Sequence, residues 1–429
     1  MIDDELQVLG TPHDNKKLNK WVIAIIAILA IVIGTVFYIF ISSTQPEIIK
    51  SGKRMGDSTI VKELQETVVK MLNDELTEID GLQGQVIVME VQTGEILAMV
   101  GLERNFEGAY QPCNNFAYQQ EPGSTMQTVS LLAALETDKV NLFDVVQTGT
   151  GVYPVDNERE MVDHNWRRGG YGTITLDRAL EVSSNIGIGI AVNKAFGNNQ
   201  QGFFDQLEKM SFGQPEHING IEGLKPNKYS SPKDSNWIKR RIWWSAVGYE
   251  RLMTPIQMLT FYNAIANDGK MVKPTLKTGE IEIINPQIAF KDNIKRMQTV
   301  LDHVVSQGLG KKAGTDIIRV AGKTGTAQIK EYDYGEGVYV SEYHLVFCGY
   351  FPAEKPKYSM IVSMNKLGLP ASGGGMAGAL FHNIMEWMIT HDMPSLAVID
   401  EETNDTIQVS EKTINKVHEI LEKQEENNH

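Results

Sequence analysis

The chain has 429 residues and a formal net charge of -14, with 42% hydrophobic and 22% charged residues. These proportions are those of a globular protein with a sizeable core, and they exclude a disordered or fibrous chain. The acidic balance, without a long basic block, argues against nucleic acid as a partner.

The two cysteines, Cys113 and Cys348, lie far apart in the sequence, so they cannot form a disulfide framework or a CxxC metal site. One long-range disulfide between them remains open, but we expect two unpaired thiols. The nine histidines form no HExxH motif. We therefore expect no metal and no other cofactor.

A run of apolar residues near the N-terminus, 21–41, reads WVIAIIAILAIVIGTVFYIFI and contains no charged residue. Its length as a helix is about 30 Å, the thickness of a hydrocarbon core. The run predicts a transmembrane anchor over residues 21–42. It is too long for the apolar part of a signal peptide and no Ala-x-Ala site follows, so the anchor is expected to stay uncleaved.

The orientation of this anchor follows from its flanking charges. Lys16, Lys17 and Lys20 precede it, and lysines close to a membrane span favour the cytoplasmic side. We therefore expect a cytoplasmic tail over residues 1–20 and an extracytoplasmic (periplasmic) main domain. The anchor would hold this domain on the cell inner (cytoplasmic) membrane, and residues 43–57 would form the linker between them.

Helical and strand patterns alternate along the main domain. Apolar residues at helical spacing predict a helix within 58–76, and QVIVMEV and EILAMV predict a hairpin through Thr93 and Gly94. The middle third is mostly helical and loop-rich. Strand patterns return at IIRVA (317–321), HLVFCGYF (344–351) and YSMIVSM (358–364), and residues 377–389 predict a closing helix.

Strands at both ends of a domain with helices between them indicate an α+β fold, in which late strands complete the sheet. We assign this domain to residues 58–392. The remaining residues, 393–429, have nine acidic residues and three lysines from position 400 onward. This composition favours a solvated tail over a helix that docks on a partner.

The segment EPGSTMQTVSLLAALE (121–136) places Ser124 before an apolar helical run. At a helix N-terminus, unpaired N–H groups and the positive end of the helix dipole favour developing negative charge, which suits a nucleophile. An ordinary N-cap serine is the alternative.

Two later segments support a nucleophile at this position. LEVSSNIGIGIAV contains Ser183 and Asn185, and IIRVAGKTGTAQ places Lys323 to Thr326 at the end of a predicted strand. Together the three segments resemble the SxxK, SxN and KTG set of penicillin-binding proteins and class A β-lactamases. Two other SxxK matches, SSPK at 230–233 and SMNK at 363–366, lie in a polar loop and a strand, and we regard them as chance matches.

Longer stretches resemble the transpeptidase domain of class B penicillin-binding proteins over residues 58–390, among them GQVIVMEVQTGEILAMVG, DHNWRRGGYGTITLDRALEVSSNIG and FCGYFPAEKPKYSMIVSMN. This resemblance implies an antiparallel sheet flanked by helices, with a mostly helical lobe that bears the nucleophile. It also implies a role in peptidoglycan synthesis at the cell wall, with a D,D-transpeptidase (serine acyl-transferase) activity.

The resemblance implies catalytic roles for three residues. Ser124 would attack the carbonyl of the penultimate D-alanine of a peptidoglycan stem peptide, or of its lipid-linked precursor, and release the last D-alanine. Ser183 would relay a proton and Lys323 would supply positive charge. β-Lactams mimic that peptide and would acylate the same serine.

The resemblance also implies substrate contacts. Asn185 would hold the peptide amide, while Thr324, Gly325 and Thr326 would line the strand that binds the substrate edge and its carboxylate. The backbone N–H groups of Ser124 and Thr326 would form the oxyanion hole.

Two features depart from the family pattern. Gln127 stands three residues after Ser124, where the family has a lysine that accepts the serine proton. An amide has no useful basicity, and loss of a general base slows such reactions by about 10² to 10⁴. The second departure is a linker too short for the large non-catalytic module of class B members, so the domain should lie close to the membrane.

These observations leave two main hypotheses. The first is a working D,D-transpeptidase or D,D-carboxypeptidase in which Lys323 or Ser183 replaces the missing base. The second is a pseudoenzyme that acts as a partner or regulator of other cell-wall synthesis proteins. A β-lactam or muropeptide sensor is less favoured, because twenty residues are too few for a cytoplasmic signalling domain.

Overall fold

The structure is a computed structural model that describes residues 58–333 and 339–396, with side chains up to His391. The predicted cytoplasmic tail, membrane anchor and linker lie outside the described residues, as does the predicted acidic tail beyond Leu396. Within the described ranges, no helix is both long and apolar enough to cross a membrane.

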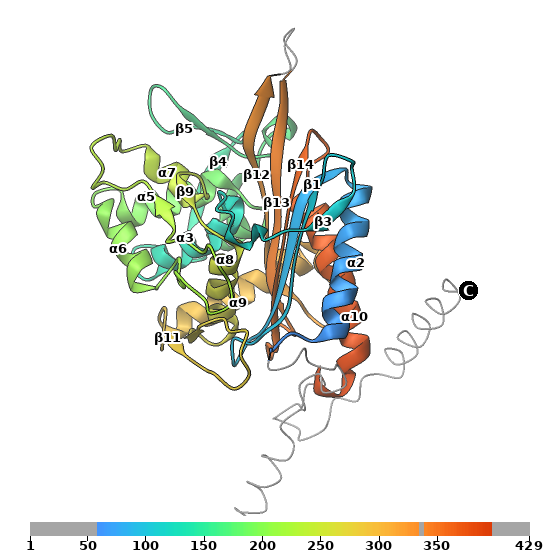
Figure 1. Ribbon diagram of the computed structural model, residues 1–429. Coiled ribbons are helices and arrows are strands. Elements are labelled where there is room, and N and C mark those ends of the chain that lie inside the picture. The colour runs from blue at the N-terminus through green and yellow to red at the C-terminus, as the bar shows by residue number, and fades with distance from the viewer. Residues whose placement is uncertain (1–57, 334–338, 397–429) are drawn as a thin grey trace, which may run out of the picture. The chain divides into compact units, whose positions relative to one another are not determined.

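A six-stranded antiparallel sheet forms the centre of the domain (Figure 1). Its strands, in spatial order, are β12 (Ala321–Asp333), β13 (Tyr339–Phe351), β14 (Tyr358–Leu367), β1 (Gly81–Glu90), β2 (Ile96–Arg104) and β3 (Tyr110–Pro112). The predicted hairpin is the β1–β2 pair, and β1 also pairs with β14, for example Ile87 with Ile361. The expected α+β fold, with a sheet that is completed late in the chain, is confirmed.

One predicted strand is placed wrongly. Residues 317–320 lie outside any strand, and β12 begins only at Ala321, opposite Tyr350 of β13. The ladder cannot extend far beyond that pair, because β13 runs into Pro352, which has no N–H to donate. Lys323 to Thr326 therefore lie near the start of a long strand and not at the end of a short one.

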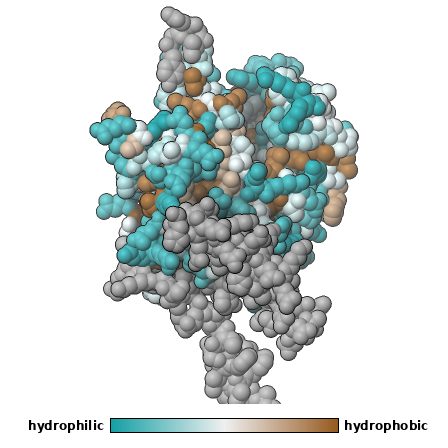
Figure 2. All heavy atoms as spheres, turned by 90° about the vertical axis from the view of Figure 1, so that its right-hand side faces the viewer, coloured by the Kyte–Doolittle hydropathy of each residue, from teal (hydrophilic) through white to brown (hydrophobic). Residues whose placement is uncertain are grey.

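Helices α2 (Lys62–Glu78) and α10 (Gly378–Leu396) pack together on one side of the sheet (Figure 1). In α2 the buried residues are Leu64, Val68, Leu72 and Leu76, which recur every four residues and face the sheet. Figure 2 shows this side of the molecule. Hydrophilic residues make up most of its coloured surface, with separate hydrophobic patches between them. The closing helix is longer than predicted and continues into the range assigned to the tail.

The predicted, mostly helical lobe is present and lies on the other side of the sheet (Figure 1). Its helices are α3 (Met126–Leu135), α4 (Leu176–Glu181), α5 (Asn185–Phe196), α6 (Gln201–Lys209), α7 (Arg241–Ala246), α8 (Pro255–Ala266) and α9 (Lys291–Ser306). Four two-stranded sheets lie between these helices: β4 (Val145–Gly149) with β7 (Gly172–Thr175), β5 (Val152–Pro154) with β6 (Glu160–Val162), β8 (Lys228–Tyr229) with β9 (Arg251–Leu252), and β10 (Met271–Val272) with β11 (Ile283–Asn285).

Helix α8 joins the lobe to the sheet, and all twelve of its residues are buried. It begins at Pro255, and the Gln257 side chain reaches back to accept a hydrogen bond from the Thr254 N–H at 3.0 Å. Inside the helix, the Tyr262 hydroxyl is hydrogen-bonded to the Thr125 carbonyl oxygen at 2.9 Å and to Thr128 Oγ1 at 2.8 Å. This tyrosine therefore fixes the turn that carries Ser124 against the core.

Removal of the hydroxyl group should change the free energy of unfolding differently at two buried tyrosines. Tyr262→Phe leaves buried acceptors unpaired and should lower the free energy of unfolding by about 1–3 kcal/mol. Tyr350→Phe is the matched control, because the Tyr350 hydroxyl is buried without a partner among the described residues. Its replacement should be neutral or stabilising. Urea denaturation of both variants measures the difference, and equal losses would contradict this account.

Candidate active site

Ser124 lies in a short 3-10 turn, Gly123–Thr125, that leads directly into α3. Its predicted position at a helix N-terminus is confirmed. Gly248 packs behind the turn with a φ of +98°, and a Cβ there would lie 2.0 Å from the Gly123 carbonyl oxygen, so only glycine fits. Ser124 is partly exposed, and its hydroxyl makes no hydrogen bond to any residue in the described ranges.

Gln127 follows one helical turn after Ser124 and is fully buried. Its side chain is held at both ends of the amide: Oε1 accepts a hydrogen bond from Ser183 Oγ at 3.0 Å, and Nε2 donates to Asn185 Oδ1 at 2.9 Å. The amide thus links the first predicted motif to the second.

Lys323 completes this arrangement from β12. Its Nζ donates to Ser183 Oγ at 2.8 Å and to the Thr324 carbonyl oxygen at 2.9 Å. Asn185 in turn donates to the Val162 carbonyl oxygen at 3.1 Å. Lys323, Ser183, Gln127 and Asn185 therefore form one continuous hydrogen-bonded series, here called the polar chain, from three segments far apart in the sequence.

The charge state of Lys323 is set by burial. The side chain has no exposed surface, and within the described residues no carboxylate lies within 4 Å of its ammonium group. Desolvation disfavours the charged amine and lowers its pKa from 10.5 to about 7. At neutral pH a substantial fraction of Lys323 is therefore neutral and able to accept a proton.

The segment from Lys323 to Thr326 lies on β12, the edge strand of the sheet, beside the Ser124 turn. Thr324 is buried, whereas Thr326 is exposed and its Oγ1 accepts a hydrogen bond from the Gly373 N–H at 2.8 Å. Gly373 approaches so closely that a Cβ there would lie 1.9 Å from the Gly325 carbonyl oxygen. An edge strand of this kind presents backbone groups with which an extended peptide can pair.

Ser183 adopts a φ of +55°, in the short connection between α4 and α5. The next residue, Ser184, caps α5 by accepting a hydrogen bond from the Gly187 N–H. Asp163 holds this cap, because its carboxylate accepts hydrogen bonds from Ser184 Oγ at 2.7 Å and from the Ile186 N–H at 3.0 Å. The backbone that carries Ser183 and Asn185 is thus fixed on both sides.

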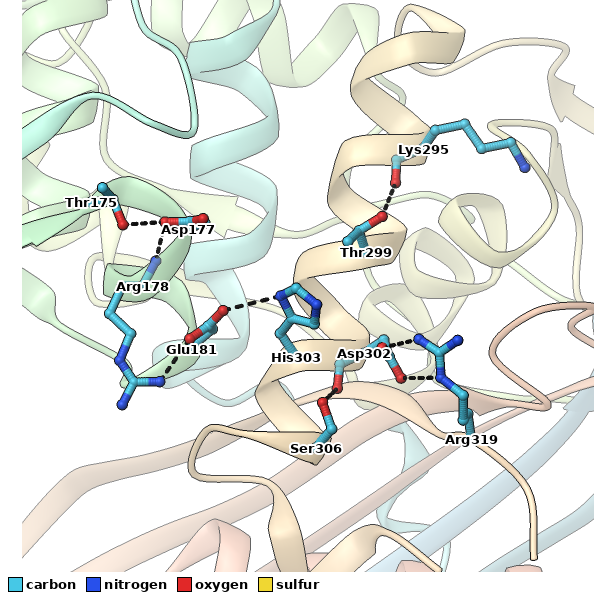
Figure 3. Close-up of polar contacts among 10 residues, drawn as sticks. All are labelled: Thr175, Asp177, Arg178, Glu181, Lys295, Thr299, Asp302, His303, Ser306 and Arg319. Carbon is cyan, nitrogen blue, oxygen red and sulfur yellow. Dashed lines mark hydrogen bonds and ion pairs between the residues drawn. The ribbon is translucent and has the colours of Figure 1, made fainter.

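A contact between a glutamate and a histidine joins α4 to α9 just before Ser183 (Figure 3). Glu181, at the end of α4, lies 2.7 Å from Arg178 and 3.3 Å from His303 of α9. The preceding residue of α9, Asp302, pairs with Arg319, two residues before β12 begins. Helix α9 therefore ties the segment that leads to Ser183 to the segment that leads to Lys323.

The sequence reasoning missed several residues around the polar chain. The Nε2 atom of His164 lies 3.0 Å from the Tyr171 hydroxyl, and partial desolvation, followed by the charges of Arg168 and Lys323, lowers the pKa of His164. Asp163 and Gly373 are further examples. His164 and Asp163 belong to the quoted stretch that begins DHN, but no motif marks them. Only the folded chain shows that Asp163 holds the cap next to Ser183 and that the charge of Lys323 acts on His164.

The matches that we set aside lie outside the polar chain. Ser363 on β14 is hydrogen-bonded to His344 at 2.7 Å, and Lys366 donates to the carbonyl oxygens of Leu367 and Gly368. Ser230 lies near Arg241. Cys113 and Cys348 are free thiols, as expected.

The model of the penicillin binding protein transpeptidase domain matches residues 84–386, well over half of the chain. The chain belongs to the penicillin-binding protein transpeptidase family. The matched range includes every residue of the polar chain.

Relatives of this transpeptidase domain include stage V sporulation protein D of Bacillus subtilis, which is 29% identical over 73% of this chain and 49% of the relative. Peptidoglycan D,D-transpeptidase FtsI of Escherichia coli is 26% identical over 75% of this chain and 53% of the relative. The chain therefore spans about half the length of these relatives.

The fold of the transpeptidase domain of penicillin-binding protein 3 from Burkholderia pseudomallei is similar, with a TM-score of 0.66 and 24% identity over 79% of this chain and 96% of that one. This likeness supports the expected fold of a penicillin-recognising transpeptidase.

Proposed function

We propose that the site around Ser124 binds peptidoglycan stem peptides, or their lipid-linked precursor, and β-lactams, and that Ser124 forms an acyl-enzyme slowly. The contact between Lys323 Nζ and Ser183 Oγ, at 2.8 Å in a buried site, carries this proposal. It keeps an amine with a pKa near 7 in the cluster even though Gln127 has replaced the lysine of the first motif.

The acylation step needs an acceptor for the Ser124 proton. As Ser124 Oγ bonds to the penultimate D-alanine carbonyl, its proton would pass to Ser183, and the Ser183 proton would pass to neutral Lys323. Collapse of the tetrahedral intermediate breaks the peptide bond, and the departing D-alanine amine takes a proton back through the same groups. An amine of a second stem peptide, or water, would then attack the acyl-enzyme and restore Ser124.

The rate of this route should be low. Gln127 can orient Ser183 but cannot accept a proton, so the acceptor acts through Ser183. Loss of a directly placed base slows such reactions by about 10² to 10⁴. Substrate binding would use Asn185 for the peptide amide, with Thr324, Gly325 and Thr326 along the strand edge and substrate carboxylate.

A second candidate function is that of a pseudoenzyme that regulates other cell-wall synthesis proteins. One observation favours it: the Ser183 hydroxyl donates to Gln127 Oε1, so the amide satisfies the polar chain without any base. A site that is complete in its hydrogen bonds can bind a peptide without reacting with it.

We further infer that the domain is anchored in the inner membrane with residues 1–20 in the cytoplasm and the domain, 58–392, in the periplasm. The charge-free run over residues 21–41 and the three preceding lysines support this division. Residues 43–57 would form the linker and 393–429 the acidic tail.

The anchor is tested by extraction of membranes that contain the full chain. We expect the protein to resist sodium carbonate at high pH and to dissolve in detergent, whereas replacement of Ile28 and Val32 by Arg should release it, because charges at the bilayer centre are strongly disfavoured. Release of the unaltered chain by carbonate would rule out a spanning anchor.

Acylation is tested by intact mass spectrometry of the full chain after incubation with a β-lactam. We expect a slow, stoichiometric adduct that Ser124→Ala abolishes and that forms about 10² to 10⁴ times faster in Gln127→Lys. No adduct on the unaltered chain, with a rapid adduct on Gln127→Lys, would instead support the pseudoenzyme. Absence of any adduct on both would refute an acylable serine.

The pH dependence of the acylation rate should follow the protonation state of Lys323. Because the neutral amine is the acceptor, the adduct should form faster as the pH rises through about 7, with about a tenfold increase between pH 6 and pH 8. Lys323→Arg keeps the charge but loses the titration, so its rate should be low and flat over this range. A flat profile for the unaltered chain would assign the proton to another acceptor.

A further inference from the structure

A second buried cation lies in the helical lobe, away from the polar chain. Arg251, on β9, lines a cavity of about 590 Å³ between α6 and the segments around residues 211–229 and 284. This volume falls in the range of small-molecule sites. None of the four residues of the polar chain lines the cavity.

Arg251 is buried, with 5% of its surface exposed, yet it has no ionic partner. Its guanidinium lies over the rings of Tyr229 at 4.3 Å and Phe212 at 5.1 Å, and it donates one hydrogen bond to Asn227 Oδ1. No carboxylate of the described residues lies within 4 Å of it. A guanidinium has five N–H donors, so this setting leaves donors unused beside the cavity.

Two arginines close to Arg251 in the sequence do have carboxylate partners. Arg241 pairs with Glu250, and Arg240 pairs with Asp156 and Glu158, although both arginines are more exposed than Arg251. A buried cation without a counter-charge is costly, and burial lowers the pKa of Arg251 to about 10. The stacking rings orient the guanidinium, but they do not neutralise it.

The other charged side chains that line the cavity are acidic. Glu208 and Glu216 line it with exposed side chains, and Glu208 accepts a hydrogen bond from the Tyr229 hydroxyl at 3.1 Å. Leu207 and Ile284 form an apolar part of the cavity wall. The cavity thus combines a buried cation, apolar sides and exposed carboxylates.

We propose that this cavity binds a small zwitterion, an amino acid or a short peptide, whose carboxylate pairs with Arg251 and whose ammonium group faces Glu208 and Glu216. The guanidinium can hold a carboxylate through two parallel hydrogen bonds, and that pairing supplies the missing counter-charge. An anion without a cationic end would meet the two glutamates and bind less well. This site is independent of the acyl-serine chemistry proposed for Ser124.

The test is isothermal titration calorimetry on the full-length chain in detergent. The probes are ω-amino acids with two to six carbon atoms, from glycine to 6-aminohexanoate, which vary the spacing between the two charges. Hexanoate lacks the ammonium group and hexylamine lacks the carboxylate. We expect one-to-one binding of at least one ω-amino acid, binding of hexanoate at least about tenfold weaker, and no binding of hexylamine.

Three variants locate the binding. Arg251→Gln should weaken it by about tenfold or more, because a charge-assisted pair is lost. Ile284→Trp fills the cavity without altering Arg251 and should cause a similar loss. Ser124→Ala should bind like the unaltered chain, which separates this site from the acyl-serine site. Circular dichroism melting checks that each variant is folded, and if Arg251→Gln is not, Ile284→Trp decides.

The proposal is overturned if no ω-amino acid binds the unaltered chain, or if binding survives both Arg251→Gln and Ile284→Trp. Arg251 would then be only a structural clamp between Tyr229 and Asn227. Equal affinities for hexanoate and the ω-amino acids would show that the ammonium group contributes nothing to binding. That result would refute a zwitterionic ligand and the role of Glu208 and Glu216.

Discussion

The burial of one amine, that of Lys323, organises the site. Its hydrogen bonds to Ser183 and to the Thr324 carbonyl oxygen replace part of the water that the ammonium group loses. For that contact to form, β12 must run beside the Ser124 turn, and the α4–α5 connection must point its left-handed Ser183 toward the strand. Helix α9, through the Glu181 and Asp302 pairs, holds these two segments in register.

The buried charge of Lys323 favours a neutral side chain at position 127. A lysine at that position would place a second cation beside Lys323 in a buried cluster, and like charges there disfavour one another. The amide keeps the hydrogen bonds to Ser183 and Asn185 while it removes the charge. The polar chain therefore keeps its hydrogen bonds without a proton acceptor at position 127, so the choice between the two proposed functions depends on Lys323.

Lys323 and Arg251, both buried cations of this domain, respond to desolvation in different ways. Desolvation brings the pKa of Lys323 to about 7, so the lysine can relieve its burial by losing a proton. Desolvation brings the pKa of Arg251 only to about 10, so the arginine stays charged at neutral pH. The first group is therefore suited to proton transfer, and the second is suited to binding an anion.

The sequence by itself determined the features that depend on short-range pattern: the β1–β2 hairpin, the helix behind Ser124, the closing helix and the three motifs with their family. The prediction of a strand over 317–321 was wrong, because the apolar residues there do not reveal that Pro352 ends the pairing with β13. Asp163, His164, Gly373 and the cavity at Arg251 carry no local pattern. Tertiary structure alone decided that Gln127 joins Ser183 to Asn185 and that Lys323 is buried, because burial, and with it the pKa of an amine, depends on residues brought together from distant parts of the chain.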